Sequence, residues 1–301
     1  MIQPTYNELR RTGELHEKVE EAYKLMTPCE LCPRCCGIDR LAGRVGVCRT
    51  GVLPVISSYG PHFGEEPPLV GVNGSGTIFF GNCNLECIFC QNYEVSHGDQ
   101  SREISIEDLA DIMLNLGRQG CHNINLVSPT HQLPQILSAL EIAAEAGLDI
   151  PIVYNCSGYE PVKVLAILDG IVDIYLPDAK YGNNDIGLVL SGVPDYWDRN
   201  REALREMYAQ VGDLSMDDRG IAQSGLLVRH LVLPEGLAGT REVMHFLATD
   251  ISKDIYVNIM DQYRPAYQAV GHPALGRRIT REEYEEALRI AKAEGLWRFA
   301  E

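Results

Sequence analysis

The sequence predicts an α/β protein with a parallel sheet, built as a full or partial (β/α) barrel or as a doubly wound sheet. Six short β-rich runs alternate with helical patterns from residue 76 onward, and the runs show little polar alternation. Strands that are buried on both faces of a parallel sheet have this pattern. Strand–helix units in series also imply parallel strands. The runs are GTIFFGN (76–82), CHNINLVSP (121–129), DIPIVYNC (149–156), IVDIYLPD (171–178), GLLVRHLVLP (225–234) and DIYVNIMD (254–261).

The chain before residue 76 has a different character. Residues 7–26 are expected to form one amphipathic helix with a thin apolar stripe. Residues 27–75 are rich in Cys, Gly and Pro, which is typical of a loop-rich segment held together by metal. We therefore divide the chain into a cysteine-rich metal-binding extension with its leading helix, residues 1–75, and a barrel with a C-terminal helix, residues 76–301.

Helices are expected between the strand runs. Ser105 can cap a helix over 105–118 whose apolar residues fall on one face. Thr280, followed three residues later by Glu283, forms a capping-box pattern and begins a final helix that runs to about residue 292. The remaining helices are expected at 132–147, 160–169 and 239–250, with an extra helix pair around 185–211 and a mobile acidic loop, LSMDDRG.

Composition narrows the classes of function. The 26 basic and 42 acidic residues give a net charge of −16. Because phosphate binding needs clustered Lys and Arg, we expect no nucleic-acid partner. No stretch reaches about 18 consecutive apolar residues, and the N-terminus has no apolar signal region. We therefore expect a cytoplasmic protein with no membrane partner.

Cysteine is the most informative residue type. Eight of the ten cysteines lie between residues 29 and 90, and without a secretion signal they indicate metal rather than disulfides. They form two groups, and Cys121 and Cys156 stand apart in apolar surroundings as expected buried thiols. The first group is Cys29, Cys32, Cys35, Cys36 and Cys48, and the second is Cys83, Cys87 and Cys90.

The second group has the spacing C-x3-C-x2-C and directly follows the first strand run. Three thiolates in one loop suit an iron–sulfur cube better than zinc, which usually closes a tetrahedron of four ligands. Three cysteines leave one iron of the cube open for a substrate or cofactor. The end of a barrel strand is also where barrel active sites lie.

This loop resembles the C-x3-C-x-φ-C motif of the radical S-adenosylmethionine (SAM) superfamily, with Phe89 as the aromatic residue. GSGTIFFGNCNLECIFCQN, NLVSPTH, VYNCSGYE, VDIYLPDAKY, RHLVLP and YVNIMDQYRP are similar to the pyruvate formate-lyase activating enzyme-related subfamily, over roughly residues 27–270. The resemblance implies a partial (β/α)6 barrel that is open on one side. It also implies a [4Fe–4S] cluster on Cys83, Cys87 and Cys90. The reduced cluster would cleave SAM to methionine and a 5′-deoxyadenosyl radical, which abstracts hydrogen from the substrate.

The same resemblance implies roles for residues at the strand ends. Phe89 is expected against the adenine. Ser128 and Thr130 stand where the superfamily has a glycine-rich motif, and Asn155 stands where glycyl-radical activases carry an acidic residue. His131 is either an extra acid–base group or a residue that begins a helix. We accordingly expect Phe89, Ser128, Thr130, Asn155, Asp178 and Arg229 to contact the cofactor.

Three charged residues are expected to be catalytic. Asp178 and Lys180 resemble the D-x-K of the activases, and their position at a strand end favours function over a surface salt bridge. Arg229 lies in an apolar strand, where a charge is costly unless it is paired. It is therefore a candidate for the cofactor carboxylate or ribose, or one half of an ion pair that fills the barrel. Further polar residues that could line the mouth are Asn258, Asp261, Gln262, Tyr263 and Arg264.

The upstream cysteines predict a second metal site. Cys29, Cys32, Cys36 and Cys48 give four ligands for either zinc or a second iron–sulfur cluster. Resemblance to a C-x-x-C-P-R-x-C element of related radical enzymes leaves Cys35 as a non-ligand. The metal would hold a segment that is too poor in apolar residues to fold alone.

The substrate class stays open at this level. A protein or peptide substrate would suit a glycyl-radical activase, and a small molecule is the alternative. The departures at 128–131 and Asn155 argue against direct activation of pyruvate formate-lyase. A non-catalytic metal-binding interaction protein, with zinc at both cysteine groups, is the competing class. The expected partners are SAM and an electron donor such as flavodoxin or ferredoxin.

Overall fold

A computed structural model describes residues 3–300 of the chain. Its centre is one sheet in the order β10-β9-β8-β6-β5-β4-β2-β1-β3, with β7 paired to β8. Neighbouring strands from β2 to β10 on this path are parallel, whereas β1 is antiparallel to both β2 and β3. The parallel strands are β2 (Ser75–Phe80), β4 (Ile124–Val127), β5 (Ile152–Cys156), β6 (Ile174–Pro177), β8 (Ala222–Leu231), β9 (Tyr256–Met260) and β10 (Arg298–Phe299).

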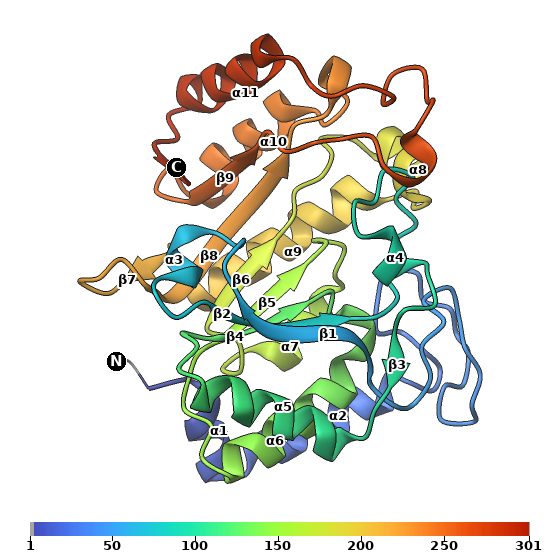
Figure 1. The fold of residues 1–301 in the computed structure, drawn as a ribbon, viewed down its shortest axis with the longest axis vertical. Helices are drawn as coiled ribbons and strands as arrows, with labels where there is room; N and C mark the ends of the chain where they lie inside the picture. The colour runs from blue at the N-terminus through green and yellow to red at the C-terminus, as the bar shows by residue number, and fades with distance from the viewer. Residues whose placement is uncertain (1–2, 301) are drawn as a thin grey trace.

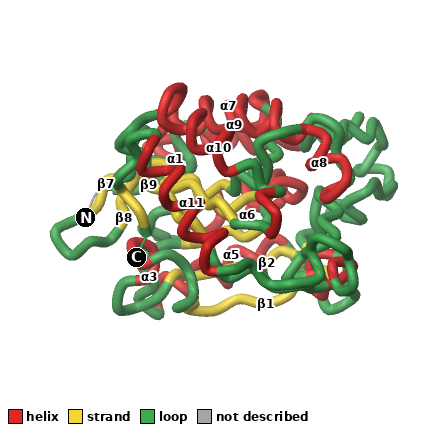
Figure 2. The backbone as a smooth tube through the Cα atoms, turned by 90° about the horizontal axis from the view of Figure 1, so that it is seen from above, coloured by secondary structure: helices red, strands yellow, loops and turns green. Residues whose placement is uncertain are grey.

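The predicted fold class is confirmed. Each of the six β-rich runs overlaps one of the strands β2, β4, β5, β6, β8 and β9, although β2 begins one residue and β8 three residues before the predicted run. The sheet path ends at β3 on one side and β10 on the other, so the barrel is partial and open. In Figure 1 the strands fan out across the middle of the molecule, with α5 and α6 at one end and α10 and α11 at the other. The tube in Figure 2 shows β1 and β2 on the opposite side of the molecule from α7, α9 and α10.

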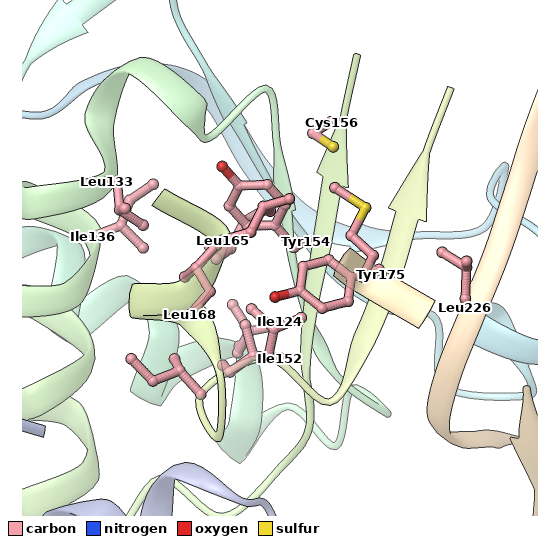
Figure 3. Packing of buried hydrophobic residues seen from close by; sticks show 14 of the residues in the cluster. Ile124, Leu133, Ile136, Ile152, Tyr154, Cys156, Leu165, Leu168, Tyr175 and Leu226 are labelled. Carbon is pink, nitrogen blue, oxygen red and sulfur yellow. The ribbon is translucent and has the colours of Figure 1, made fainter. Parts of the chain in front are cut away.

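Alternate residues along the strands face the helices and form the main core. Ile124, Ile152 and Tyr154 point outward and pack with Leu133 and Leu165 of the covering helices (Figure 3). Burying one such side chain contributes about 1.5–3 kcal/mol, so this outer core accounts for much of the stability of the fold. The covering helices are α5 (Ile106–Arg118), α6 (Leu133–Glu145), α7 (Val162–Leu168), α8 (Asn184–Ser191), α9 (Tyr196–Val211), α10 (Thr240–Phe246) and α11 (Arg281–Ala293).

Helix starts agree with the sequence, and two helix extents do not. Ser105 and Thr280 both cap their helices through complete capping boxes. The single helix predicted over 7–26 is wrong. It is two helices, α1 (Tyr6–Thr12) and α2 (Glu14–Lys24), because Gly13 between them adopts a left-handed backbone with φ 85°. The single helix predicted over 239–250 is instead α10, which ends at Phe246, followed by one π-helical turn that ends at Ile251.

A short segment of the extension packs into the barrel interior and closes it on one side. Leu69 of α3 (Pro67–Val70) lies in one cluster with Val153, Ile174 and Leu227, which are inward-facing residues of the strands. This segment enters between β1 (Val55–His62) and β2, and β1 is hydrogen bonded to β2. The extension therefore shares a sheet and a core with the barrel, and the division at residue 75 stays a prediction.

The remaining elements are short. Within LSMDDRG, β7 pairs with β8. Among residues 3–300, no helix combines the length and the apolar character needed to cross a bilayer. The short elements are β3 (Arg102–Glu103), α4 (Tyr93–Ser96), η1 (Thr130–Gln132), β7 (Ser215–Met216), η2 (Pro234–Gly236), η3 (Leu247–Ile251) and η4 (Tyr267–Ala269).

Candidate active site

The three-cysteine loop leaves β2 and is fixed to α8. Asn82 begins it with a left-handed backbone, φ 68°, and donates its N–H to the carbonyl of Val95 over 3.0 Å. The N–H groups of Glu86 and Ile88 donate to the carbonyls of Ser191 and Leu190 at the end of α8. These bonds hold the loop around Cys87 from both sides.

Each of the three thiols has a polar contact. The Sγ atom of Cys87 lies 2.9 Å from the hydroxyl of Ser191, and that of Cys90 lies 3.2 Å from the hydroxyl of Ser96. The N–H of Leu85 donates to Cys83 Sγ over 3.4 Å. Hydrogen bonds of this kind are the ones that tune iron–sulfur clusters.

Burial keeps the thiols of Cys83 and Cys87 protonated when no metal is bound. It raises the pKa of Cys83 to about 12 and also raises that of Cys87. The ammonium of Lys180 acts in the opposite direction on both thiols. Binding an iron–sulfur group would therefore release protons, because only thiolates ligate metal.

The cysteines share a cavity with the charged strand ends. A cavity of about 230 Å³ is lined by Cys87, Phe89, Asp178 and Arg229, with Lys180 beside them. A recess of about 160 Å³ shares several of these walls. The walls common to both spaces are Cys87, Cys90, Asn92, Asp178, Lys180 and Arg229, and the recess adds Cys83, Ser128, Asn155 and Ser157.

Ser157 gives a direct indication of what the recess can hold. Its Oγ atom is buried in the recess wall and has no hydrogen-bond partner among the described residues. A buried hydroxyl without a partner is costly, so a polar ligand that reaches this wall would satisfy it. Three thiols with hydrogen-bond donors, next to such a wall, fit an iron–sulfur cluster with a polar cofactor beside it.

Arg229 links three strands at their carboxyl ends. Its Nε donates to Asp178 Oδ1 over 2.9 Å, and its Nη2 donates to Asn155 Oδ1 over 2.6 Å. On the other side of Asp178, Lys180 Nζ donates to Oδ2 over 2.5 Å. Burial alone would raise the pKa of Asp178, but the two cations outweigh it and hold that pKa below its usual range. Asp178, Lys180 and Arg229 are therefore all ionised, and all three line the cavity.

Sequence reasoning missed two acidic residues of this network. Glu65 Oε2 lies 3.7 Å from Arg229 Nη1, and Asn155 Nδ2 donates to the same Glu65 oxygen over 3.5 Å. Glu66 accepts from Asn258 over 3.0 Å, and its other carboxylate oxygen is buried without a partner. The available signal was the buried charge of Arg229, which requires an acidic partner somewhere in the chain.

Phe89 lies in the cavity wall and is held by other aromatic rings. Its ring meets Tyr181 and Tyr263 edge-on, with centroids 6.3 and 6.1 Å apart. Gln262 lines the same cavity, whereas Tyr263 is buried behind Phe89. Asn258 donates to Glu66 and is not among the residues that line this cavity.

Two other predicted residues lie away from the cavity. Thr130 is buried and donates its hydroxyl to Glu160 Oε1 over 2.7 Å. His131 is buried, contacts the carbonyl of Gly81 over 2.9 Å, and has its pKa lowered by burial to about 4. These residues form η1, whose side chains point into the protein, so both have structural partners here.

The upstream cysteines lie close together. Burial raises the pKa of Cys32, and the charges of Cys48 and Cys36 add to this effect. Cys48 is influenced in the same way by Cys29, whereas Cys35 is exposed. Over residues 3–300, no three Cys, His, Asp or Glu side chains are already arranged to hold one metal ion. The extension also contacts the cluster loop, since Arg34 Nε donates to the carbonyl of Asn84 over 2.6 Å.

Comparison with known proteins defines the class. The sequence profile of the radical SAM superfamily matches residues 77–213. An uncharacterized protein of Methanocaldococcus jannaschii, MJ0674, is 34% identical over 289 residues, which cover 93% of this chain and 78% of that protein. The chain therefore contains a radical SAM superfamily domain over residues 77–213 and belongs to the same family as this archaeal protein. A domain of this superfamily implies cleavage of SAM by radical chemistry at a [4Fe–4S] cluster, with the electron supplied by a donor.

The solved structures to which the chain shows similarity are distant in sequence. Methylornithine synthase is 15% identical, with a TM-score of 0.47 over 71% of this chain and 60% of that one. The hydrogenase maturase HydG is 12% identical, with a TM-score of 0.48 over 72% and 48%. The methyltransferase TsrM of Kitasatospora setae is 14% identical, with a TM-score of 0.45 over 62% and 36%. The chain thus spans less than two thirds of each of these proteins.

Proposed function

We propose that Cys83, Cys87 and Cys90 hold the [4Fe–4S] cluster and that SAM lies between this cluster and the charged residues on β6 and β8. One observation carries the proposal: Cys87, Cys90, Asp178, Lys180 and Arg229 line the same two adjoining spaces. When bound, the reduced cluster supplies the electron that cleaves SAM and yields the 5′-deoxyadenosyl radical.

The charged residues would bind and orient the amino-acid part of SAM. Its carboxylate suits Arg229 and Lys180, and its ammonium group suits Asp178. Because these three side chains already pair with one another, they are held in fixed positions before the cofactor arrives. Asn155 accepts from Arg229 and keeps the guanidinium aimed at the recess.

The apolar walls would serve the adenosyl part and exclude water. Phe89, Leu231, Leu233 and Met260 line the cavity next to the charged residues. A dry site protects a reactive radical from side reactions and strengthens the electrostatic contacts around it. Phe89, whose ring is fixed by Tyr181 and Tyr263, is the residue we assign to the adenine.

The substrate we propose is a protein or peptide from which hydrogen is abstracted, as in the pyruvate formate-lyase activating enzyme-related subfamily. A small-molecule substrate is the second candidate. It is favoured by the small size of the cavity beside the cysteines, about 230 Å³, and by the departures at Ser128 and Asn155 from the activase pattern. In either case we assign substrate contact to Met260 and Gln262, which line the same cavity and come from a part of the chain far from the cysteines in sequence.

For the extension we propose a second metal site on Cys29, Cys32, Cys36 and Cys48, with Cys35 as a non-ligand. The mutual influence of these thiols and the exposure of Cys35 support this ligand set. We also propose that residues 1–75 form a metal-binding unit beside the barrel, 76–301, and that the protein works in the cytoplasm. The radical SAM superfamily domain at residues 77–213 supports a catalytic role over a non-catalytic one.

Electron paramagnetic resonance of anaerobically reconstituted, dithionite-reduced protein tests this proposal. The wild type and a Cys121→Ala control should give a [4Fe–4S]+ signal that changes shape when SAM is added, because the open iron gains a ligand. Cys87→Ala should lose this change and should form no 5′-deoxyadenosine. A Cys87→Ala protein that cleaves SAM at the wild-type rate would refute the cluster assignment.

A further inference from the structure

Two hydrogen bonds from the extension hold the chain on both sides of Cys83. Asn82, just before Cys83, donates from Nδ2 to the hydroxyl of Thr50 over 3.2 Å. Asn84, just after it, accepts at its carbonyl from Arg34 Nε over 2.6 Å. The extension therefore contacts the cluster loop at the residues on either side of a proposed cluster ligand.

The two residues that make these contacts are also bonded to the upstream cysteines. Arg34 comes two residues after Cys32, and Thr50 comes two residues after Cys48. The backbone of Arg34 forms a hydrogen bond to the thiol of Cys32, and that of Thr50 forms one to the thiol of Cys48. The Thr50 hydroxyl also donates to the carbonyl of Cys48 over 2.9 Å. Because hydrogen bonds to the ligands of a metal orient those ligands, each residue serves an upstream ligand and the cluster loop at once.

Arg40 indicates that the upstream site carries negative charge when it is complete. Its side chain is fully buried, and its Nη1 and Nη2 donate to the carbonyls of His131 and Gly51, each over 2.7 Å. Its Nε is buried with no hydrogen-bond partner among the described residues. Burial raises the pKa of Cys48, and the nearby charge of Arg40 acts against this rise. A buried cation with neutral partners is costly, and four thiolates around a metal would supply the missing negative charge.

Cys83 depends on its neighbours more than the other two cluster thiols do. Each of those two contacts a serine hydroxyl of a helix. The described contacts of the Cys83 thiol lie within its own loop, 3.4 Å from the N–H nitrogen of Leu85 and 3.8 Å from Oδ1 of Asn84. The bonds that hold Asn82 and Asn84 therefore decide where this thiol lies.

We propose that Arg34 and Thr50 are positioning residues that couple the upstream metal site to Cys83. This inference rests on the two proposed metal sites. With all four ligands bound, the upstream metal fixes the two turns from which these residues reach the cluster loop. Coupling between two binding sites is reciprocal, so the cluster should in turn stabilise the upstream metal.

The experiment measures how long the cluster persists. Each protein is reconstituted anaerobically, its zinc and iron contents are measured by mass spectrometry, and loss of the SAM-responsive [4Fe–4S]+ signal is followed in the presence of the iron chelator ferrozine. Thr50→Val removes the hydroxyl that accepts from Asn82, and Thr50→Ser keeps it. Arg34→Met removes the bond to Asn84, and its matched control Glu86→Gln removes only the ion pair of Arg34.

Thr50→Val and Arg34→Met should each lose the signal about fivefold faster than the wild type, which corresponds to one buried hydrogen bond. Thr50→Ser and Glu86→Gln should match the wild type. In Cys32→Ala, which should lack the upstream metal and keep its circular dichroism spectrum, Thr50→Val and Arg34→Met should have little further effect, because the upstream turns are already released. A role confined to the cluster loop would give the same fivefold effect in both backgrounds and would overturn the coupling.

Reciprocity gives a second measurement that does not need Cys32→Ala. Cys87→Ala, which cannot form the complete cluster, should release its upstream metal to a chelator faster than the wild type does. Release at the wild-type rate, or a Thr50→Val protein that keeps its signal as long as Thr50→Ser, would overturn the inference and leave both metal sites standing. A wild type without a SAM-responsive signal would instead refute the cluster assignment, and equal metal contents in Cys32→Ala and the wild type would refute the upstream site.

Discussion

Arg229 Nε donates to Asp178 Oδ1 over 2.9 Å, and this contact joins the ends of β6 and β8 inside the barrel. The two residues are 51 positions apart in sequence, yet their backbones also form a bridge between the two strands. The ion pair therefore lies at a position that the parallel register fixes. Lys180, two residues after Asp178, adds a second cation to the same carboxylate.

Replacing Asp178 by Asn should weaken both cofactor binding and the fold. The change leaves Arg229 and Lys180 without their shared counter-charge in a largely buried site, which costs about 3 kcal/mol. We expect a lower midpoint of urea unfolding and weaker SAM binding by calorimetry. Asp198→Asn, which breaks an exposed pair with Arg201, is the control and should change neither quantity. Equal stability of the two variants would contradict this account of Asp178.

Ser191→Ala should change the reduction potential of the cluster. The Ser191 hydroxyl lies 2.9 Å from Cys87 Sγ and 2.6 Å from the hydroxyl of Tyr181, and both side chains are buried. Tyr181 can donate to Ser191, which leaves the Ser191 proton for the Cys87 thiolate. A hydrogen bond to a cluster sulfur favours the reduced, more negative state, so its loss should lower the potential.

A redox titration followed by electron paramagnetic resonance measures this shift. Tyr181→Phe should shift the potential in the same direction by a smaller amount, since Ser191 keeps its hydroxyl. Ser138→Ala removes a hydroxyl on α6 that is hydrogen bonded to Pro134 and Tyr23, and this variant serves as the control. If Ser191→Ala titrates like the control, the contact between Ser191 and Cys87 does not tune the cluster.

The sequence predicted those parts of the molecule that local patterns determine. The strands were visible because both of their faces are buried, and Arg229 was singled out because a charge in such a strand needs a partner. The partners Glu65 and Ser191 were not predicted. Glu65 reaches Arg229 across 164 residues only because α3 enters the barrel, and Ser191 reaches Cys87 because α8 ends on the loop. No local pattern encodes either approach.

Thr130 and Ser128 show how the conformation of one turn decides which side chains line the recess. The place of Thr130 after the second parallel strand of the barrel suggested a cofactor contact. In the structure the chain turns there into η1, and the Thr130 hydroxyl donates to the buried Glu160. Ser128, two residues earlier, has a left-handed backbone with φ 59° and does line the recess. The conformation of this turn, which sequence position alone does not give, separates the two residues.

His230 should make the protein less stable in acid. The carbonyl of Ala179, 2.7 Å from Nδ1, can only accept, so neutral His230 carries its proton on Nδ1 and accepts from Thr240 at Nε2. Burial lowers its pKa from 6.5 to about 4. Between these pH values the unfolded chain binds a proton that the folded chain does not. This residue's contribution is therefore complete above pH 6.5 and falls by up to about 1.4 kcal/mol per pH unit toward pH 4.

Urea unfolding of wild type and His230→Asn between pH 7 and pH 4.5 tests this dependence. The stability difference between the two proteins should shrink as the pH falls. Only in the wild type does the unfolded chain bind a proton at position 230 that the folded chain excludes. His245→Asn, at an exposed site on α10, should differ from the wild type by an amount that does not follow this trend. A constant difference for His230→Asn would show that His230 is not held neutral in the folded protein.

Cys32→Ala should release the metal that we propose for the extension. Cys32 is buried beside Cys36 and Cys48, and loss of one of four ligands lowers metal affinity strongly. Cys35→Ala is the matched control, since Cys35 is exposed and adjoins Cys36 in sequence. Zinc and iron contents, measured by mass spectrometry after anaerobic reconstitution, should fall in Cys32→Ala alone. Whichever element falls identifies the metal, and equal contents in both variants would mean that these cysteines hold none.

Because Arg34 ties this segment to the carbonyl of Asn84, Cys32→Ala should also loosen the cluster loop and broaden the cluster signal.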